Sequence, residues 1–183
     1  ILKNRDFIDM EKKTILQIIP SLVSGGIERG VTEINSYLVK NNFNSIVLSS
    51  GGKMTYQIKQ NGGKSIELNV ATKNPFKIWT NIKKIKQIII DNKVDIVHVR
   101  SRAPAWSAYY ACKLLNVPLI STIHGNYSMG SFPFKWLKRK YNSFIFKADW
   151  IICVSNYIKE YSFENYKSFR EKFIENKTRI IPR

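Results

Sequence analysis

The sequence predicts an α/β protein built on one doubly wound parallel sheet. Short apolar segments alternate along the chain with longer segments whose apolar residues recur at helical spacing. Most of the short segments are continuously apolar, as expected for strands that are buried on both faces. Each predicted strand is also followed by a polar or glycine-rich turn that leads into the next element. Together these features predict parallel strands covered by helices on both sides.

The first half of the chain supplies three predicted strands. "TILQIIP" (14–20) is short, rich in isoleucine and closed by a proline, which favours a buried strand. Ile27, Val31, Ile34 and Leu38 then recur at helical spacing and predict a helix over 27–41. The following elements are a strand over 45–50, a short helix over 54–63 that glycines end, and a strand over 64–69.

The second half continues the alternation. A long helix over 75–92 begins at Pro75, with Ile78, Ile82, Ile85 and Ile89 on one face and lysines elsewhere. The remaining predicted elements are a strand over 95–99, a helix over 103–115, a strand over 118–123, a basic aromatic segment over 133–147, a strand over 150–154, a helix that opens at Ser155, and the closing "RIIP" at 179–182.

Length and composition predict a single globular domain. The chain has 183 residues, of which 44% are hydrophobic, and we expect a lead-in over 1–13 and one domain over 14–183. No apolar run approaches the roughly 20 residues of a bilayer span, and the first residues are too polar for a secretory signal. We therefore expect a cytoplasmic location. Cys112 and Cys153 meet neither metal-ligand nor redox spacing and are expected to be buried free thiols.

The chain is strongly basic. Thirty Lys and Arg against thirteen Asp and Glu give a formal charge of +17, which attracts nucleic acid, anionic lipid or phosphorylated substrates. In "FPFKWLKRKYNSFIFK" (132–147) aromatic and basic residues are mixed. Two interpretations stay open: a helix that lies on an anionic membrane, or aromatics packed on the sheet with solvated lysines. The helix at 77–93 has the same ambiguity.

Ligands of doubly wound sheets bind outside the carboxyl ends of the strands, so the residues after each strand are the candidates for a site. They are Ser24-Gly25-Gly26, Ser49-Ser50-Gly51, Arg100-Ser101-Arg102, His124-Gly125-Asn126 and Ser155-Asn156.

Gly25-Gly26 precedes a helix, where backbone N–H groups can face a phosphate or diphosphate. The spacing is not that of a dinucleotide fingerprint, and a simple tight turn is the alternative. Glu28, in the first helical turn, is a further candidate. His124 could bond a sugar hydroxyl or a leaving group, whereas His98 lies inside a strand and is expected to be structural.

The other candidates have structural alternatives as well. Arg100 and Arg102 could bind phosphate bidentately, although surface arginines are common on a protein this basic. Ser155 is a candidate for substrate binding, and capping the following helix is its more frequent job.

Four segments in this order resemble the N-terminal domain of family 4 retaining glycosyltransferases, which have the two-domain GT-B fold. They are "ILQIIPSLVSGGIERGVTEINSYL", "DIVHVRSRAPAWSAYYACKLLNVPLISTIHG", "ADWIICVSNYIKEY" and the closing "RIIP". The resemblance implies a Rossmann-like acceptor-side domain in cell-envelope polysaccharide or lipopolysaccharide synthesis. Its substrates would be a nucleotide-sugar donor and a glycan or lipid-linked acceptor, with no separate cofactor and no metal. It would work in the cytoplasm or on the inner face of the cytoplasmic membrane.

The resemblance also implies roles for individual residues. Gly25 and Gly26 would approach the donor diphosphate or the acceptor, and His124 would contact the transferred sugar. The acceptor cleft would be lined by Arg100 and Ser101, with Lys138 or Arg139 as further candidates. Gly125 and Asn126, directly after His124, are candidates for substrate binding.

The family continues after "RIIP" into a second Rossmann-like domain that supplies most donor contacts, and this sequence stops at Arg183. We expect the domain to need such a partner for activity. A fragment of a longer protein, a separately encoded partner domain and a decayed remnant all stay open. A partner-binding half-domain and a basic nucleic-acid-binding module are the alternative functions, and the second ranks lower because the sheet should be buried on both sides.

Overall fold

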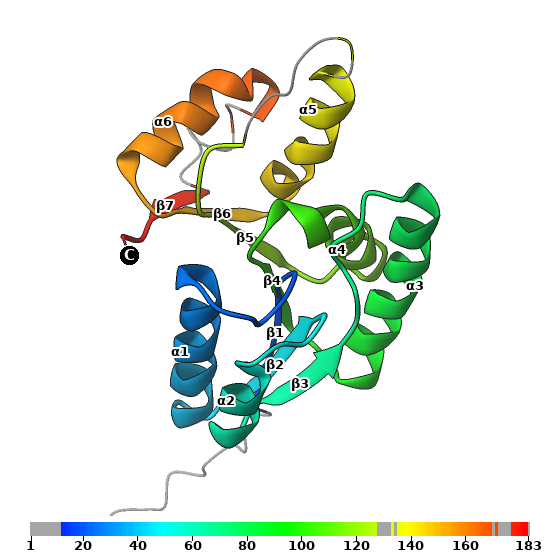
Figure 1. Ribbon diagram of the computed structural model, residues 1–183, viewed down its shortest axis with the longest axis vertical. Coiled ribbons are helices and arrows are strands. Elements are labelled where there is room, and N and C mark those ends of the chain that lie inside the picture. Colours follow the sequence, from blue (N-terminus) through cyan, green and yellow to red (C-terminus); the bar gives the residue numbers. More distant parts are fainter. Residues whose placement is uncertain (1–11, 128–132, 134, 170, 172–176, 183) are drawn as a thin grey trace, which may run out of the picture.

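The computed structural model describes residues 12–127, 133, 135–169, 171 and 177–182, which form one seven-stranded sheet with helices on both sides (Figure 1). The strands are β1 (Thr14–Ile18), β2 (Asn44–Ser49), β3 (Lys64–Glu67), β4 (Ile96–Val99), β5 (Leu119–Ile123), β6 (Trp150–Cys153) and β7 (Thr178–Ile180). The α-helices are α1 (Gly26–Lys40), α2 (Thr55–Gln60), α3 (Pro75–Asp91), α4 (Arg102–Leu115), α5 (Lys135–Ser143) and α6 (Asn156–Asn165). Two short 3-10 helices are η1 (Phe144–Lys147) and η2 (Lys167–Phe169).

The strand order confirms the predicted doubly wound architecture. It runs β3-β2-β1-β4-β5-β6-β7, and every neighbouring pair is parallel. The order reverses between β1 and β4, so loops that leave these two adjacent strands diverge to opposite sides of the sheet. In sheets of this kind that divergence creates the ligand crevice.

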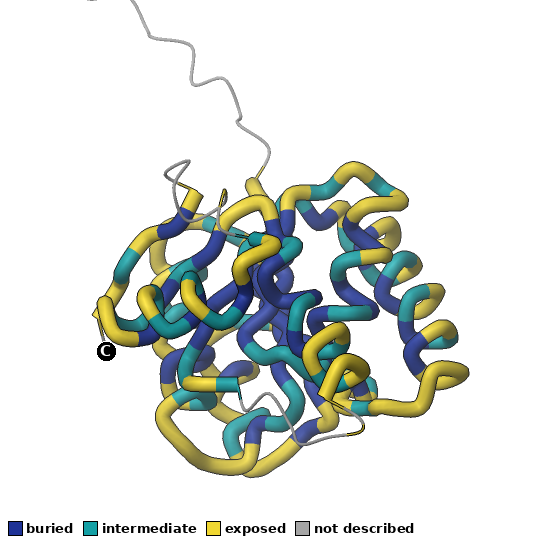
Figure 2. Tube along the Cα trace, turned by 90° about the horizontal axis from the view of Figure 1, so that it is seen from above, coloured by how far each residue is buried: buried dark blue, intermediate teal, exposed yellow. Residues whose placement is uncertain are grey.

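Two hydrophobic clusters fill the spaces between the sheet and its helices. The smaller cluster joins Val31 of α1 and Ile58 of α2 to Val47 of β2. The larger cluster joins residues of α3, α4, η1 and α6, such as Ile85 and Ala108, to the other face of the sheet. Figure 2 shows the buried residues gathered at the centre of the molecule with exposed residues around them. Right-handed crossovers between parallel strands account for this division of the helices.

The two ends of the basic aromatic segment differ in burial, so neither of the two interpretations that the sequence left open holds for the whole segment. Phe144 and Phe146 of η1 are buried, and the Phe144 ring stacks on Trp106 at a centroid distance of 4.4 Å. Trp136 of α5, by contrast, is 62% exposed. Phe132 and Phe134 lie outside the described residues. The C-terminal part of the segment is therefore core, and its helical part presents aromatic and basic side chains to solvent.

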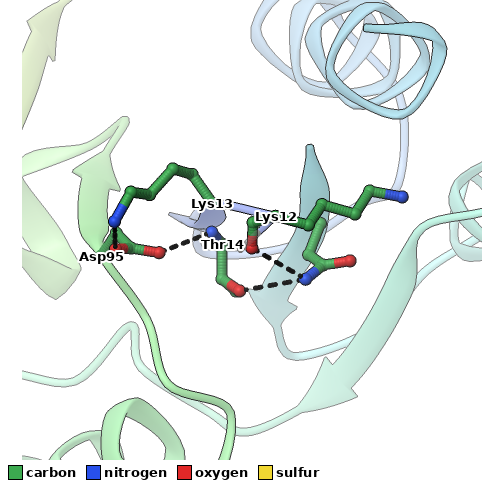
Figure 3. Close-up of polar contacts among 5 residues, drawn as sticks. Lys12, Lys13, Thr14 and Asp95 are labelled. Carbon is green, nitrogen blue, oxygen red and sulfur yellow. Dashed lines mark hydrogen bonds and ion pairs between the residues drawn. The ribbon is translucent and has the colours of Figure 1, made fainter. Parts of the chain in front are cut away.

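The amino edge of the sheet is held by polar contacts around the start of β1 (Figure 3). Lys13 Nζ lies 2.8 Å from Asp95 Oδ1, and Asp95 Oδ2 accepts a 2.8 Å hydrogen bond from the backbone N–H of Thr14. These hydrogen bonds, together with the charge of Lys13, lower the pKa of Asp95. Lys12 contributes its carbonyl, which accepts a 3.3 Å hydrogen bond from the Asn44 side chain. The last residues of the lead-in thus fasten β1 to β2 and β4.

Both cysteines are free and buried, as predicted. Burial raises the pKa of Cys112 to about 12 and that of Cys153 to about 11. Neither thiol is therefore ionised near neutral pH, which is typical of cysteines that pack as small apolar side chains.

Candidate functional site

The glycine pair lies at the end of the loop that connects β1 to α1. Gly25 precedes the helix with φ of 140°, a conformation that favours glycine, and its carbonyl accepts the first helical bond, from the N–H of Arg29 at 3.1 Å. A Cβ added at Gly25 would lie 2.6 Å from Oε2 of Glu28, whereas a Cβ at Gly26 would meet no atom within 4 Å. Gly26 thus borders open space at a helix N-terminus, and the Glu28 carboxylate folds back beside Gly25.

A second glycine pair supports this loop from the end of β2. Leu22 donates its N–H to the Gly51 carbonyl, and Met54 donates its N–H to the Leu22 carbonyl, both at 2.8 Å. Gly52, with φ of 141°, lies so close to the Leu22 backbone that any Cβ would overlap it. Sequence reasoning did not assign this role to Gly51-Gly52, because it depends on contact between two loops rather than on either loop alone.

Arg100 follows β4 and turns back into the protein. Its side chain is only 2% exposed, and Nη1 donates a 3.4 Å hydrogen bond to Oε1 of Gln17, whose own Nε2 donates to the Val31 carbonyl in α1. This chain of contacts links β4, β1 and α1 beneath the glycine loop. Contact of Arg100 with a ligand therefore stays a prediction. In the structure, its side chain connects the end of β4 to β1.

The next residues begin α4. Ser101 is half-buried at the N-cap position, and its side chain makes no capping hydrogen bond. Arg102 is half-buried and donates from Nη1 to Oδ1 of Asn142 at 3.1 Å, while its guanidinium lies 5.2 Å from the ring centroid of Tyr127. Burial raises the pKa of Tyr127, and the nearby Arg102 charge opposes that rise. Arg102 thus connects α4 to α5 and to the loop after β5.

The loop after β5 carries the histidine. His124 is half-buried directly after Ile123, and a Cβ at Gly125 would meet no atom within 4 Å. Asn126 donates a 3.0 Å hydrogen bond to the hydroxyl of Tyr157 in α6. This side-chain contact fixes the loop against α6 beside the histidine, and no local sequence signal predicted it.

The other histidine is structural, as predicted. His98 is buried within β4, and its Nε2 lies 2.7 Å from Oγ1 of Thr122 in β5. It therefore bridges two neighbouring strands on the sheet face and does not reach the carboxyl edge.

Three further candidates have identifiable partners or positions. Ser155 Oγ accepts a 3.2 Å hydrogen bond from the N–H of Ile158, so it caps α6, which is the structural alternative that the sequence offered. Arg139 is exposed and donates to the carbonyl of Asn165 at 3.2 Å, joining α5 to the end of α6. Lys138 is half-buried on α5.

The fold brings the glycine pair and His124 to one edge. Because all strands are parallel, the loops after β1, β4 and β5 leave the sheet on the same side. β1 and β5 are separated by β4 alone, so their ends lie roughly 10 Å apart at the usual strand spacing. This spacing suits a ligand with a phosphate at the glycine loop and a sugar-sized group beside the histidine. Among residues 12–127 and the later described positions, no group of three His, Cys, Asp or Glu side chains could hold a metal ion.

Comparisons with known proteins agree with this arrangement. Residues 24–183 match the family described as Glycosyltransferase Family 4. A crystal structure of a glycosyltransferase from Rickettsia africae superposes with a TM-score of 0.77 at 42% sequence identity, covering 94% of this chain and 43% of that protein. A comparison with curated protein sequences gave no match.

Two more distant structures share the fold. HepE from Anabaena, solved with UDP and glucose, has a TM-score of 0.65 at 14% identity and matches 92% of this chain and 44% of its own length. The lipopolysaccharide outer core galactosyltransferase WaaB has a TM-score of 0.63 at 16% identity and matches 93% of this chain and 45% of its own length. This chain thus spans less than half the length of each of these proteins. Since the family match covers most of the sequence and the fold is that of GT-B glycosyltransferases, the chain belongs to glycosyltransferase family 4.

Proposed function

We propose that this chain is the N-terminal, acceptor-side domain of a glycosyltransferase that moves a sugar from a nucleotide-sugar donor to a glycan or lipid-linked acceptor. The observation that carries the proposal is the family match over residues 24–183, combined with a parallel sheet whose switch point lies between β1 and β4. The position of Gly25-Gly26 and of His124 at the same edge of that sheet supports it.

In the proposed reaction the bond between the anomeric carbon and the donor diphosphate breaks, and a bond to the acceptor hydroxyl oxygen forms with the same anomeric configuration. The proton of the acceptor hydroxyl leaves with the diphosphate. The N-terminus of α1 offers N–H groups and a partial positive charge to the departing anion. Open space beside Gly26 would let the ligand approach the backbone closely.

His124 would contact the transferred sugar. It is half-buried and follows β5, so its backbone is held by the sheet while its side chain is at the edge. The bonds of Asn126 to Tyr157 and of Tyr161 to the Tyr127 carbonyl hold the same loop against α6. A loop fixed in this way can orient an imidazole toward a hydroxyl without a large loss of conformational entropy on binding.

Similar structures support the class of substrate. HepE was solved with UDP and glucose, and WaaB is a lipopolysaccharide galactosyltransferase. By this likeness we assign the domain to cell-envelope polysaccharide or lipopolysaccharide synthesis from a nucleotide sugar, in the cytoplasm at the inner face of the membrane. A donor-binding second domain would complete the cleft.

The experiment is a panel of nucleotide sugars offered to the complete two-domain protein, or to this chain mixed with a separately encoded C-terminal domain. We expect one donor to be consumed with release of its nucleoside diphosphate when an envelope glycan or lipid-linked acceptor is present. Release that does not depend on an acceptor, or no release with any donor, would contradict the proposal.

A partner-binding half-domain is the second candidate, and the face of the sheet that carries α1 favours it. α1 and α2 pack near β1 and β2, whereas Ile120 of β5 and Ile152 of β6, on the same face, stay half-buried. If this half-domain only binds a partner, a second polypeptide should bury these side chains and no nucleotide sugar should be consumed. Hydrogen exchange of β5 and β6 with and without that polypeptide measures the difference.

A further inference from the structure

The positive charge of the protein is concentrated on one layer of helices. α3, α4 and α5 contain ten Lys and Arg and one Asp, whereas α1 and α2 contain three Lys and Arg and two Glu. α4 packs against both α3 and α5, so these three helices form a continuous layer on one side of the sheet, opposite α1 (Figure 1). We call α3, α4 and α5 the basic helix layer.

The outer side of α3 is apolar as well as basic. Phe76, Trp79 and Ile90 are 72%, 52% and 50% exposed, and their spacing, with Lys83 between them, places all four on one stripe of the helix. Lys83 Nζ lies 3.8 Å from the ring centroid of Trp79. A different set of α3 residues, which includes Ile85, is buried in the core. We call Phe76, Trp79, Lys83 and Ile90 the outer stripe of α3.

α5 adds a second such surface. Trp136 and Leu137 are exposed, α5 contains no acidic residue, and Asn142 on its inner side is buried. The Tyr141 hydroxyl lies 3.4 Å from the carbonyls of Thr72, just before α3, and of Ala103, in the first turn of α4. Tyr141 therefore holds α5 against the starts of both other helices of the layer.

The kind of exposed side chain distinguishes this layer from the helices α1 and α2 on the opposite side of the sheet. On α1 and α2 the large exposed hydrophobic residues are Tyr37 and Tyr56, which carry hydroxyls. On the basic helix layer they include the aliphatic residues Ile90, Leu114 and Leu137. Aliphatic side chains gain nothing from stacking on nucleic-acid bases, but they gain free energy when they enter the boundary between lipid headgroups and acyl chains.

We propose that the basic helix layer docks on an anionic lipid bilayer, with the outer stripe of α3 and the side chains of Trp136 and Leu137 at the headgroup boundary. Lysines beside these residues would meet the negative lipid surface, which attracts each nearby basic side chain. α3 and α5 both begin at the carboxyl edge of the sheet, where the candidate site lies. Docking would therefore bring this edge close to the membrane, within reach of a lipid-linked acceptor. None of the described helices combines the length and apolar character needed to cross a bilayer.

The test is flotation of the protein with phosphatidylcholine vesicles and with vesicles that also contain phosphatidylglycerol. We expect binding to the anionic vesicles alone, weakened by added salt. The double variant Phe76→Ser/Trp79→Ser should weaken this binding at least tenfold. The matched variant Tyr37→Ser/Tyr56→Ser changes two exposed aromatic side chains on the opposite helices and should leave binding unchanged.

A charge-reversal pair separates the charge effect from the apolar one. Lys83→Glu/Lys84→Glu on α3 should also weaken binding at least tenfold, and Lys40→Glu/Lys59→Glu on α1 and α2 should weaken it much less. All four variants alter exposed side chains, and thermal melting checks that each remains folded.

The proposal would be overturned if Tyr37→Ser/Tyr56→Ser weakened vesicle binding as much as Phe76→Ser/Trp79→Ser does. It would also be overturned if Lys40→Glu/Lys59→Glu weakened binding as much as Lys83→Glu/Lys84→Glu does. Equal binding to neutral vesicles, or binding to duplex DNA without binding to vesicles, would overturn it as well. The assay measures no sugar transfer, so its failure would leave the proposed enzymatic function standing.

Discussion

The carboxylate of Glu28 lies against Gly25, so close that a Cβ on that glycine would be 2.6 Å from Glu28 Oε2. An acidic side chain thus lies beside the helix N-terminus at which we place the donor diphosphate. Its neighbour Gly26 borders open space. The two glycines of one motif therefore have different physical reasons to be glycine, and substitution can separate them.

Gly25→Ala should destabilise the domain by about 1–3 kcal/mol, because alanine is strained at a φ of 140° and its methyl would overlap Glu28. Gly26→Ala should change the free energy of unfolding by less than about 0.5 kcal/mol, because its methyl would point into open space within the helix. If the donor approaches Gly26, the second variant should nevertheless raise the KM for the donor. Chemical denaturation and donor kinetics test both, and a stable Gly26→Ala enzyme with unchanged KM would remove Gly26 from the binding site.

Gly52 and Gly125 form a second informative pair. A Cβ at Gly52 would overlap the Leu22 backbone, which cannot move without breaking the hydrogen bonds of Leu22 to Gly51 and Met54. Gly52→Ala should therefore cost more than about 2 kcal/mol, and Gly125→Ala, with no atom near its Cβ, should cost little. Thermal melting of the two variants measures this. Equal melting temperatures would show that the loops after β1 and β2 do not support each other.

The two thiols should be inert in the native protein. Since burial raises the pKa of Cys112 to about 12 and that of Cys153 to about 11, almost no thiolate exists near neutral pH. We expect neither to react with a disulfide reagent until denaturant is added, when both should react. A thiol whose pKa is higher in the folded than in the unfolded state stabilises the fold at pH values below its unfolded pKa of about 8.5. This contribution is lost as the pH rises through the folded pKa. The free energy of unfolding should therefore fall above about pH 9, and rapid labelling of either cysteine in the native protein would contradict this account.

The contribution of Asp95 to stability should grow as the pH rises, which is opposite to the pH dependence of the two cysteines. Its pKa is lowered by the Lys13 side chain and the Thr14 N–H, so its contribution is present above the unfolded value of about 3.9 and is lost as pH falls through the folded value. Asp95→Asn should reduce the loss of stability in acid. At neutral pH it should cost less than about 1 kcal/mol, because the ion pair is partly exposed. Denaturation of both proteins at several acidic pH values measures the difference, and identical acid profiles would show that the contact with Lys13 has no energetic role.

Much of the fold could be predicted because the relevant signals are local. The isoleucine-rich segment at 14–20 and the helical spacing of Ile27, Val31, Ile34 and Leu38 specify β1 and α1 to within a few residues. Pro75 marks the start of α3, and the side chain of Asn74 caps it, accepting from the N–H groups of Phe76 and Lys77. Even the short "RIIP" segment corresponds to β7, which pairs with β6.

The site was harder to predict because its details depend on contacts between distant segments. No local pattern shows that Arg100 turns inward to Gln17, or that Gly52 lies against the Leu22 backbone. The same limit applies to the basic aromatic segment. Its residue types are similar throughout, yet Phe144 is buried and Trp136 is exposed, because packing against α4 and the sheet, not composition, decides which side chains face inward.

The most direct measurement of the proposed function compares the two histidines in the sugar-transfer assay of the complete enzyme. His124→Ala should abolish transfer and change the melting temperature only slightly, because His124 is half-buried and follows the last residue of β5. His98→Asn should lower the melting temperature, because it removes the contact with Thr122, but the folded variant should still transfer sugar. Full transfer by a folded His124→Ala enzyme would contradict the assignment of this edge as the reaction site.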